Sequence, residues 1–289
     1  MFEAASDRKP AWVSAVGRIL REPMGALGIA LVVLMVAGAI FADLLSLYEP
    51  DRISPRDRFS APSMEHFLGT DHLGRDLFAR VLHGGRIALS VALSSILISL
   101  IIGVALGLVA GYGPRRLDNL MLLLLDSIKS FPTVMLALAL VTLFGPSLTV
   151  VMVVVVLVTM PGYARIIRTQ TLALKESEFV TAAISLGAGT PRILRVHIMP
   201  NVIGPLLILA SMDIPVVIAI EAGMSFLGLG VRPPTPSWGA ILNDGYAAIR
   251  ESPWIVVAGG LPIIITTLGF TFLGETLRDV FDPRLDTRR

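Results

Sequence analysis

Four ionisable residues lie inside long apolar stretches of this chain, where a charged group needs a partner or a role. Asp126 and Lys129 stand in one stretch, and Asp213 and Glu221 stand in another with Pro215 between them. Charged side chains inside a membrane-spanning segment are costly, and those that occur pair with one another or mark a path for solute. Both explanations stay open for Asp126 and Lys129, because residues three apart on a helix can neutralise each other. We expect Asp213 to face a solute path.

Three histidines suggest metal chemistry at first sight, because His66, His72 and His83 share one polar region. Their spacings of six and eleven residues fit no compact pair of helical ligands. The chain also has no cysteine to assist. Surface histidines are the preferred interpretation, and we expect no metal bound by this chain.

Motifs for catalysis are missing from the sequence. The chain contains no HExxH, GxSxG, GxGD or DDxxD pattern, which disfavours an intramembrane protease or lipid transferase. None of its three lysines (Lys9, Lys129, Lys175) follows a glycine, so the phosphate-binding GxxxxGKS/T loop is absent. Any ATP hydrolysis must come from a partner. A passive channel or an assembly scaffold stays open, because neither needs a motif.

Composition places these residues in a membrane protein that crosses the bilayer several times. The chain has 289 residues, 54% of them hydrophobic and 16% charged, and a mean hydropathy of +0.76. A soluble domain carries more charge and less apolar surface. The net charge of +2 and the absence of a basic run exclude nucleic acid as a partner.

Six apolar segments are long enough to cross a membrane as helices, and they predict an all-α protein. The first exceeds the length of a signal-peptide core, so we expect an uncleaved helix. The third is the least regular, since it contains Asp126, Lys129 and Pro132. The predicted spans are Met24 to Leu45, Ile87 to Tyr112, Leu117 to Phe144, Leu148 to Tyr163, Val202 to Leu227 and Ile255 to Leu273.

Positive charge predicts the orientation of these spans. Fifteen Lys and Arg residues fall on the face that holds both termini, against eight on the other face. Basic residues favour the cytoplasmic side, so both termini and the polar insert from Glu178 to Asn201 are expected in the cytoplasm.

Two extracytoplasmic pieces remain. In residues 46 to 86, Thr70 and Asp71 predict a helix start, and apolar residues follow at helical spacing: Leu73, Leu77, Phe78, Val81 and Leu82. An amphipathic helix along the interface is preferred there over a specific binding surface. Residues 228 to 254 are rich in Gly and Pro, which predicts an irregular hairpin instead of a helix.

The insert from Glu178 to Asn201 predicts two short helices at an angle. Ser177 can cap the first, and Gly187 supplies the left-handed residue that ends it. Thr190 and Pro191 predict the start of a second helix that stops near Met199 and Pro200. Small Ala182 and Ala183 permit close approach by another protein, while Arg192 and Arg195 place long polar side chains at the edge of that surface. On physical grounds alone, a docking surface and an ordinary loop stay equally open.

Motifs in this insert stand at the spacing of a known element: Thr181 to Ala183, Gly187, and His197 to Pro200. The insert resembles the EAA loop of ABC importer permeases, in the dipeptide and oligopeptide form where His often stands at the position of His197. Thr181 replaces the Glu that names the loop, and Met199 replaces the more usual Leu. Three further segments resemble the same subfamily: LGTDHLGRDLFARVLHGGRIALSVAL from Leu68, EAGMSFLGLGVRPPTPSWGAILNDG from Glu221, and LGETLRDVFDPRL from Leu273.

The resemblance covers nearly the whole chain and is specific for the second permease subunit of such systems. It implies a type I ABC importer transmembrane fold in the bacterial inner membrane. Implied partners are a homologous permease, two ATPase subunits carrying ATP and Mg²⁺, an extracytoplasmic solute-binding protein and membrane lipid. The implied solute is a di- or oligopeptide, with nickel, glutathione or another small solute as alternatives.

The resemblance also divides the chain and assigns residues. Residues 1 to 86 would form the first helix with its flanking segments, and residues 87 to 289 a five-helix core with the EAA-like loop at about residues 170 to 201. The coupling residues would be Ala182, Ala183, Gly187, Ala188, Pro191, Arg192, Arg195, His197, Pro200 and Asn201. The path would involve Asp126, Phe131, Pro132, Asp213, Glu221 and Ser225, with Glu221 ordering the hairpin after it. An extracytoplasmic rim would contain Asp71, Arg75, Asp76 and Trp238.

Overall fold

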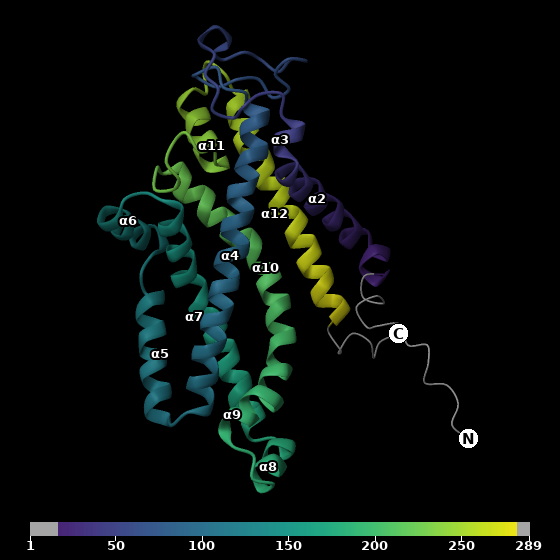
Figure 1. Ribbon diagram of the computed structural model, residues 1–289, viewed down its shortest axis with the longest axis vertical. Coiled ribbons are helices and arrows are strands. Elements are labelled where there is room, and N and C mark those ends of the chain that lie inside the picture. Colours follow the sequence, from purple (N-terminus) through teal and green to yellow (C-terminus); the bar gives the residue numbers. More distant parts are fainter. Residues whose placement is uncertain (1–16, 282–289) are drawn as a thin grey trace, which may run out of the picture.

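A computed structural model describes residues 17–281, and in that range the chain is helical with no strand longer than the single bridge between Thr70 and Asp76. The all-α prediction is confirmed. The helices form an elongated bundle (Figure 1). Their bounds are α2 Pro23–Ile40, α3 Ala42–Leu45, α4 Leu77–Tyr112, α5 Arg115–Lys129, α6 Thr133–Phe144, α7 Leu148–Lys175, α8 Glu178–Ser185, α9 Thr190–Arg192, α10 Met199–Phe226, α11 Trp238–Ala247 and α12 Trp254–Phe281.

Five of the six predicted spans each correspond to an unbroken helix long and apolar enough to cross a membrane, although the first helix ends at Ile40 instead of Leu45. The third is not a straight span: α5 and α6 meet at an angle of 85°. Proline at position 132 explains the break, because it disfavours helical backbone at Phe131 and donates no backbone hydrogen bond. The pair therefore crosses as a bent unit or turns back within the bilayer.

Two helices extend well beyond the segments predicted from hydropathy. Helix α4 begins at Leu77, where Asp76 Oδ1 accepts a hydrogen bond from the Ala79 amide at 2.7 Å. The predicted start at Thr70 and Asp71 is wrong, and no separate interfacial helix exists because α4 continues directly into the second span. Helix α7 similarly runs past Tyr163 to Lys175.

Helices α4 and α7 pack along a row of small residues four apart on α4, at Gly103, Gly107 and Gly111. A Cβ atom at Gly107 would lie 2.6 Å from the Ala164 carbonyl oxygen and from Ile167 Cβ. Such close backbone approach is how helices associate in lipid, where no hydrophobic force drives them together. Ser99 and Thr159 extend the contact through a hydroxyl hydrogen bond of 2.7 Å.

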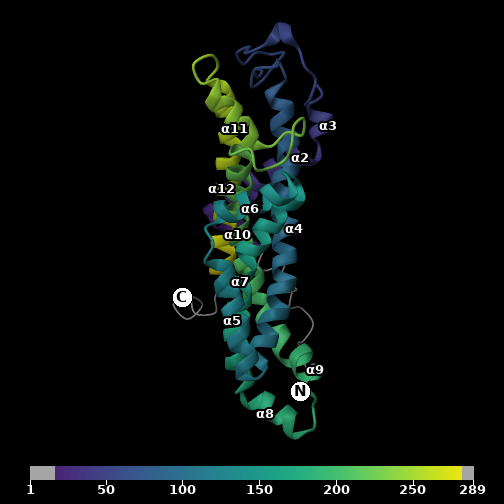
Figure 2. The same cartoon turned by 90° about the vertical axis from the view of Figure 1, so that its left-hand side faces the viewer.

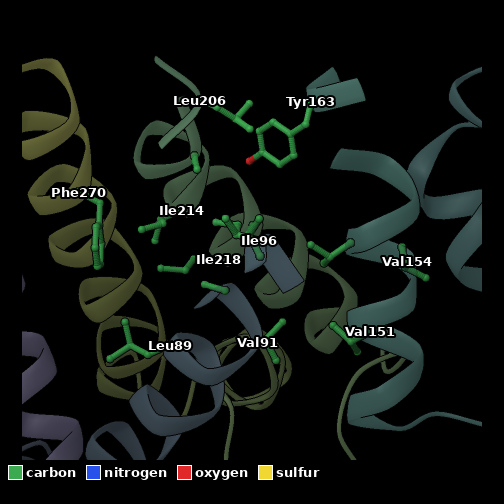
Figure 3. Close-up of a cluster of buried hydrophobic side chains, with 14 of the residues drawn as sticks. Leu89, Val91, Ile96, Val151, Val154, Tyr163, Leu206, Ile214, Ile218 and Phe270 are labelled. Carbon is green, nitrogen blue, oxygen red and sulfur yellow. The ribbon is translucent and has the colours of Figure 1, made fainter. Parts of the chain in front are cut away.

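The core lies where four long helices meet. Figure 3 shows buried side chains from all four helices in one cluster, among them Ile96 of α4, Val154 of α7, Ile218 of α10 and Phe270 of α12. Helix α10 is central, since it packs against α4, α7, α11 and α12. Side chains of α10 therefore make up much of the interior surface of the bundle.

The two ends of the bundle differ in form. One end carries residues 46–76, which are mostly irregular apart from a 3-10 turn at Pro55–Asp57, together with α3 and α11 (Figure 1). The other carries α8 and α9, which project beyond the long helices in both views (Figures 1 and 2). Both chain termini lie outside the described residues, as does the end of the motif that begins at Leu273.

The segment predicted as an irregular hairpin contains a helix. Helix α11 occupies Trp238–Ala247 and begins where Ser237 Oγ accepts a hydrogen bond from the Ala240 amide at 3.2 Å. Trp238 is fully buried and donates from Nε1 to the Val81 carbonyl at 2.8 Å. The irregular backbone predicted for residues 228 to 254 is confirmed for residues 228–237 and 248–253, which lie before and after α11.

Candidate functional site

The first helix of the insert from Glu178 to Asn201 ends as the sequence predicts. Gly187 has φ +84°, in the left-handed region. The Ala188 amide donates to the Ala183 carbonyl at 3.0 Å, and the Gly187 amide to the Ile184 carbonyl at 2.9 Å. These two bonds form a Schellman motif, which closes a helix and turns the chain sharply. The turn leads the chain from α8 into α9.

The predicted caps of the insert are wrong in detail. Ser177 occupies the N-cap position of α8, but its hydroxyl donates back to the Leu174 carbonyl at 2.6 Å and accepts nothing from the helix. Gly189 takes the N-cap position of α9, with Thr190 and Pro191 as the first helical residues. A hydroxyl with a nearer carbonyl acceptor can serve that carbonyl instead of the cap.

The second helix of the insert was predicted to stop near Met199 and Pro200, but it continues through them. A π-helical turn over Ile193–Ile198 joins α9 to α10, so one helix runs from Thr190 to Phe226. Proline inside a helix clashes with the carbonyl four residues earlier, and the wider π turn before Pro200 relieves that contact. Movement of the insert would therefore reach α10 through continuous helix.

The insert combines a buried base with an exposed apolar surface. Val180, Ile193 and Ile198 are fully or almost fully buried against the bundle. On the outside, Leu186 is 89% exposed and Ile184 is 50% exposed. Phe179 and Val196 are also exposed. The insert thus presents apolar side chains to its surroundings on a support that is packed into the bundle.

The predicted coupling residues are divided between this surface and its support. Ala183 is buried, while Ala188 and His197 are half-buried. The Asn201 amide Nδ2 donates to the His197 carbonyl at 2.6 Å. The exposed members are Ala182, Gly187, Pro191, Arg192, Arg195, Pro200 and Asn201. Residues of both kinds thus lie on one projecting element.

Asp126 does not neutralise Lys129. Its carboxylate pairs with Arg165 of α7, and Lys129 has no carboxylate partner in the part of the chain that the structure describes. Arg168 of α7 similarly pairs with Asp118 of α5. Each pair joins side chains from two different helices, and no sequence spacing indicates such a pairing.

The other predicted path residues are distributed over α10 and the α5–α6 break. The Tyr163 hydroxyl donates to Asp213 Oδ2 at 2.6 Å. Glu221 is 1% exposed and accepts from Ser225 Oγ at 2.8 Å. Phe131, like Pro132, is exposed at the bend between α5 and α6. The structure therefore brings Glu221 and Ser225 together but leaves Asp213 with a partner, Tyr163, that the sequence did not indicate.

All four predicted rim residues are buried within the end of the bundle that carries residues 46–76, α3 and α11, which we call the outer end: Asp71, Arg75, Asp76 and Trp238. Arg75 Nε donates to Asp71 Oδ2 at 2.6 Å, and Arg80 Nε lies 3.7 Å from the same oxygen. Asp71 Oδ1 accepts from the amides of Leu73 and Arg75. Arg75 also reaches Asp244 Oδ2 of α11 at 3.4 Å. We call this set (Asp71, Arg75, Arg80, Asp244) the outer ion network.

The histidines of the outer end are mostly not on the surface, which corrects that interpretation. His66 Nδ1 lies 2.8 Å from Asp76 Oδ2, and His83 Nε2 lies 2.9 Å from Asp43 Oδ1. Only His72 is substantially exposed. It approaches Asp71 and Asp244 closely enough for three metal ligands. Both oxygens of Asp71 already accept hydrogen bonds from Arg75 and from backbone amides. Asp71, His72 and Asp244 therefore fit an ion network better than a metal site.

Comparison with known proteins identifies the fold and the family. The model of the "Binding-protein-dependent transport system inner membrane component" family matches residues 103–287. The chain belongs to this family. The chain is 35% identical over 95% of its length to the dipeptide transport system permease protein DppC of Alkalihalophilus pseudofirmus, of which 90% is covered. It is 40% identical over 78% of its length to the oligopeptide transport system permease protein OppC of Haemophilus influenzae, 73% covered.

Two further likenesses complete the comparison. The glutathione transport system permease protein GsiD of Pectobacterium atrosepticum is 37% identical over 97% of this chain and 93% of its own length. An inward-facing structure of the MetNI methionine ABC transporter matches 70% of this chain and 96% of its own, with a TM-score of 0.58 and 17% identity. That structure shows the type I ABC importer transmembrane fold. The family member described here is a multi-pass inner-membrane permease subunit, and ATP hydrolysis belongs to partner ATPase subunits.

Proposed function

We propose that this permease pairs with a homologous permease to form the path for di- or oligopeptides, and that ATPase subunits drive it through the insert from Glu178 to Asn201. The projecting apolar surface of that insert carries the proposal. Leu186, Ile184 and Phe179 are exposed on an element whose base is buried in the bundle. An apolar surface on a rigid support is suited to transmit a partner's movement, and a loose loop is not.

The partners and the orientation follow from this assignment. An extracytoplasmic binding protein would deliver solute to the end that carries α11, and both termini would face the cytoplasm. The chain itself would hold no cofactor, while ATP and Mg²⁺ would bind to two ATPase subunits. The fifteen basic residues on the insert's face favour this orientation. A reporter fused after Arg289 should be cytoplasmic, and an extracytoplasmic signal would contradict it.

The coupling role can be tested at one backbone position. Gly187 has φ +84° and no atom within 4 Å of where its Cβ would lie, so Gly187→Val changes backbone conformation without a clash. A branched residue in the left-handed region costs about 1–3 kcal/mol, and the turn should reopen. We expect solute-stimulated ATP hydrolysis by the assembled complex to be lost while membrane insertion persists.

A neighbouring glycine provides the matched control. Gly189 has φ −74°, which any residue adopts, and its Cβ would meet only Pro191 Cδ at 3.9 Å. Gly189→Ala should retain stimulated hydrolysis. Full activity in Gly187→Val would count against coupling through this insert.

The solute is tested separately from coupling. Relatives of this chain are named as permeases for dipeptides, oligopeptides and glutathione. We expect the cognate binding protein to gain thermal stability with di- or oligopeptides, because a ligand bound only to the native state raises apparent stability. Stabilisation by nickel ions or glutathione alone would assign the solute to that class instead.

A further inference from the structure

Asp213 is a carboxylate in the middle of a spanning helix with no cation to neutralise it. It lies halfway along α10, Met199–Phe226, and no side-chain nitrogen of a Lys, Arg or His in residues 17–281 comes within 4 Å of its carboxylate oxygens. Two other aspartates that contact α7, Asp118 and Asp126, each pair with an arginine. The difference is notable because α7 meets Asp213 with a neutral tyrosine instead.

Tyr163 holds this carboxylate in place. Its ring is 2% exposed, and its hydroxyl donates to Asp213 Oδ2 at 2.6 Å. One carboxylate oxygen is therefore fixed on the buried side. In residues 17–281 no protein donor is bonded to the other oxygen, Oδ1, and the residue is partly exposed. A fixed acceptor with one free oxygen is suited to bind a donor from outside the chain.

The face of α10 that includes Asp213 is accessible. Val216, Ile220, Gly223 and Leu227 follow Asp213 at spacings of three and four, which puts all five on one side of the helix. Val216 is 51% exposed, Leu227 is 54% exposed, and nothing lies within 4 Å of a Cβ at Gly223. The outer half of this face opens into a cavity of about 230 Å³ against Thr133, Val134 and Ala137 of α6.

This face does not have the composition of a lipid-facing surface. Helix α4 provides the comparison, since its exposed side presents Leu93, Leu97 and Ile101. The accessible face of α10 instead includes a glycine and an ionisable residue among its apolar side chains. An ionised carboxylate facing hydrocarbon without a partner is costly, whereas one lining a wet path is tolerated.

We propose that Asp213 binds a protonated amine of the transported solute as it passes along α10, with Tyr163 as the positioning residue. This inference depends on the proposed peptide path, because a peptide carries an ammonium group at its N-terminus. Hydrogen bonds between an ammonium and a carboxylate are among the strongest in proteins. A divalent metal would require several ligands, and here one carboxylate stands beside a phenol.

Thiol labelling tests the charge and the access together. The chain has no cysteine, so Val216→Cys introduces a single thiol about one helical turn from Asp213. In the assembled transporter, with cysteines removed from its partners, this thiol should react faster with a cationic methanethiosulfonate than with an anionic one, relative to a free thiol. Adding Asp213→Asn should shift the ratio of the two rates by about fivefold. Asp213→Ser provides a second neutral variant if Asp213→Asn does not assemble.

Several outcomes of the labelling would overturn the proposal. A thiol inert to both reagents would show this face sealed against a partner. Equal relative rates in the Val216→Cys protein that retains Asp213 would show that a partner's cation already neutralises this carboxylate. An unchanged ratio in the neutral variants would show that Asp213 carries no accessible charge.

The ligand class is tested with two probes on the permease and ATPase complex without binding protein. Trialanine should slow labelling of the thiol in Val216→Cys, whereas N-acetyl-trialanine, which lacks the ammonium group, should do so about tenfold less well. Tyr163→Phe keeps the charge, so the reagent ratio should persist while protection by trialanine weakens. Equal protection by both probes would overturn amine binding. Failure of peptide uptake by the complete parent transporter would instead contradict the proposed function, whatever the reagent ratio.

Discussion

The two ends of this permease use their charged and apolar residues in opposite ways. At the outer end, Asp71 and Arg75 are buried and bonded to each other. At the opposite end, which carries the insert from Glu178 to Asn201, Leu186 and Ile184 are left exposed. The outer end therefore pairs most of its buried charged groups within the chain, although Arg80 Nε has no hydrogen-bond partner among the described residues, whereas the opposite end leaves apolar side chains uncovered.

Irregular backbone explains why the outer end needs its ion network. Residues 46–76 form few regular elements, so their amides and carbonyls must find partners outside helices. Gly74, at φ +74°, lets the chain pass so close to Ser54 that a Cβ would lie 1.8 Å from its carbonyl oxygen. Asp71 then accepts from two amides as well as from Arg75. One carboxylate thus bonds three donors within the loop, and Arg80 of α4 is the ion-pair partner that lies 3.7 Å from its Oδ2.

Breaking the outer ion network should have the largest effect on stability. Asp71→Asn leaves Arg75 and Arg80 buried beside a neutral amide, and removing one partner of a buried pair costs about 3–5 kcal/mol. We expect a large fall in the thermal unfolding midpoint of the purified chain in detergent. Asp126→Asn is the matched control, since its pair with Arg165 is 58% and 43% exposed. Its cost should stay within about 1 kcal/mol, and equal losses would contradict the contrast between buried and exposed pairs.

The contact between α11 and α4 should rank second. Trp238→Phe loses the hydrogen bond from Nε1 to Val81 and leaves space beside Gly84 and Gly85, at an expected cost of about 1–3 kcal/mol. The same unfolding measurement detects it. Trp254→Phe offers a control, because Trp254 is 46% exposed. A comparable loss there would mean that burial of Trp238 is not what anchors α11.

At the end that carries the insert, a substitution should impair coupling without affecting the fold. Leu186 is 89% exposed, so Leu186→Ser should change stability by less than about 0.5 kcal/mol. If the side chain docks on an ATPase subunit, affinity for that subunit should fall about tenfold. Titrating ATPase subunits against solute-stimulated hydrolysis would measure the change. Leu44→Ser, at a residue 81% exposed on the outer end, should leave that titration unchanged.

Local signals predicted much of this architecture and few of its long-range contacts. Hydropathy located five spans, because a helix that crosses lipid needs a continuous run of apolar residues. Gly187 located the turn of the insert, because left-handed backbone favours glycine. The partner of Asp126 is Arg165, and that of Asp213 is Tyr163, on another helix in both cases. Those pairings are set by how α7 packs on α5 and α10, which no spacing along the chain encodes.

The same limit explains two of the helix predictions that were wrong. Helix α11 forms in a Gly- and Pro-rich segment because Trp238 is buried against α4, a contact that turn propensity cannot indicate. Helix α10 continues through Pro200 because a π turn precedes it. Tertiary contact and local helix geometry overrode the sequence signals in these places.

The smallest expected effect is a pH-dependent change in stability at Asp244, which lies at the edge of the outer ion network. Burial raises the pKa of Asp244 above its ordinary value, opposed by the charges of His72, Arg80 and Arg75. A carboxyl with a raised folded-state pKa stabilises the fold fully only below its unfolded pKa of about 3.9. That stability is lost as pH rises through the folded pKa. Asp244→Asn should therefore gain stability relative to the parent chain as pH rises from about 4 toward neutrality.

The measurement is the difference between the two unfolding midpoints in detergent at each pH. A difference that grows in the opposite direction would show that Asp244 gains more from its arginine partners than it loses by burial. Asp43 provides the contrasting case, because its hydrogen bonds to Arg86 and His83 lower its pKa. Its contribution is present above its unfolded pKa and is lost as pH falls through the folded one. Opposite pH trends at Asp43 and Asp244 would separate desolvation from pairing within one end of the molecule.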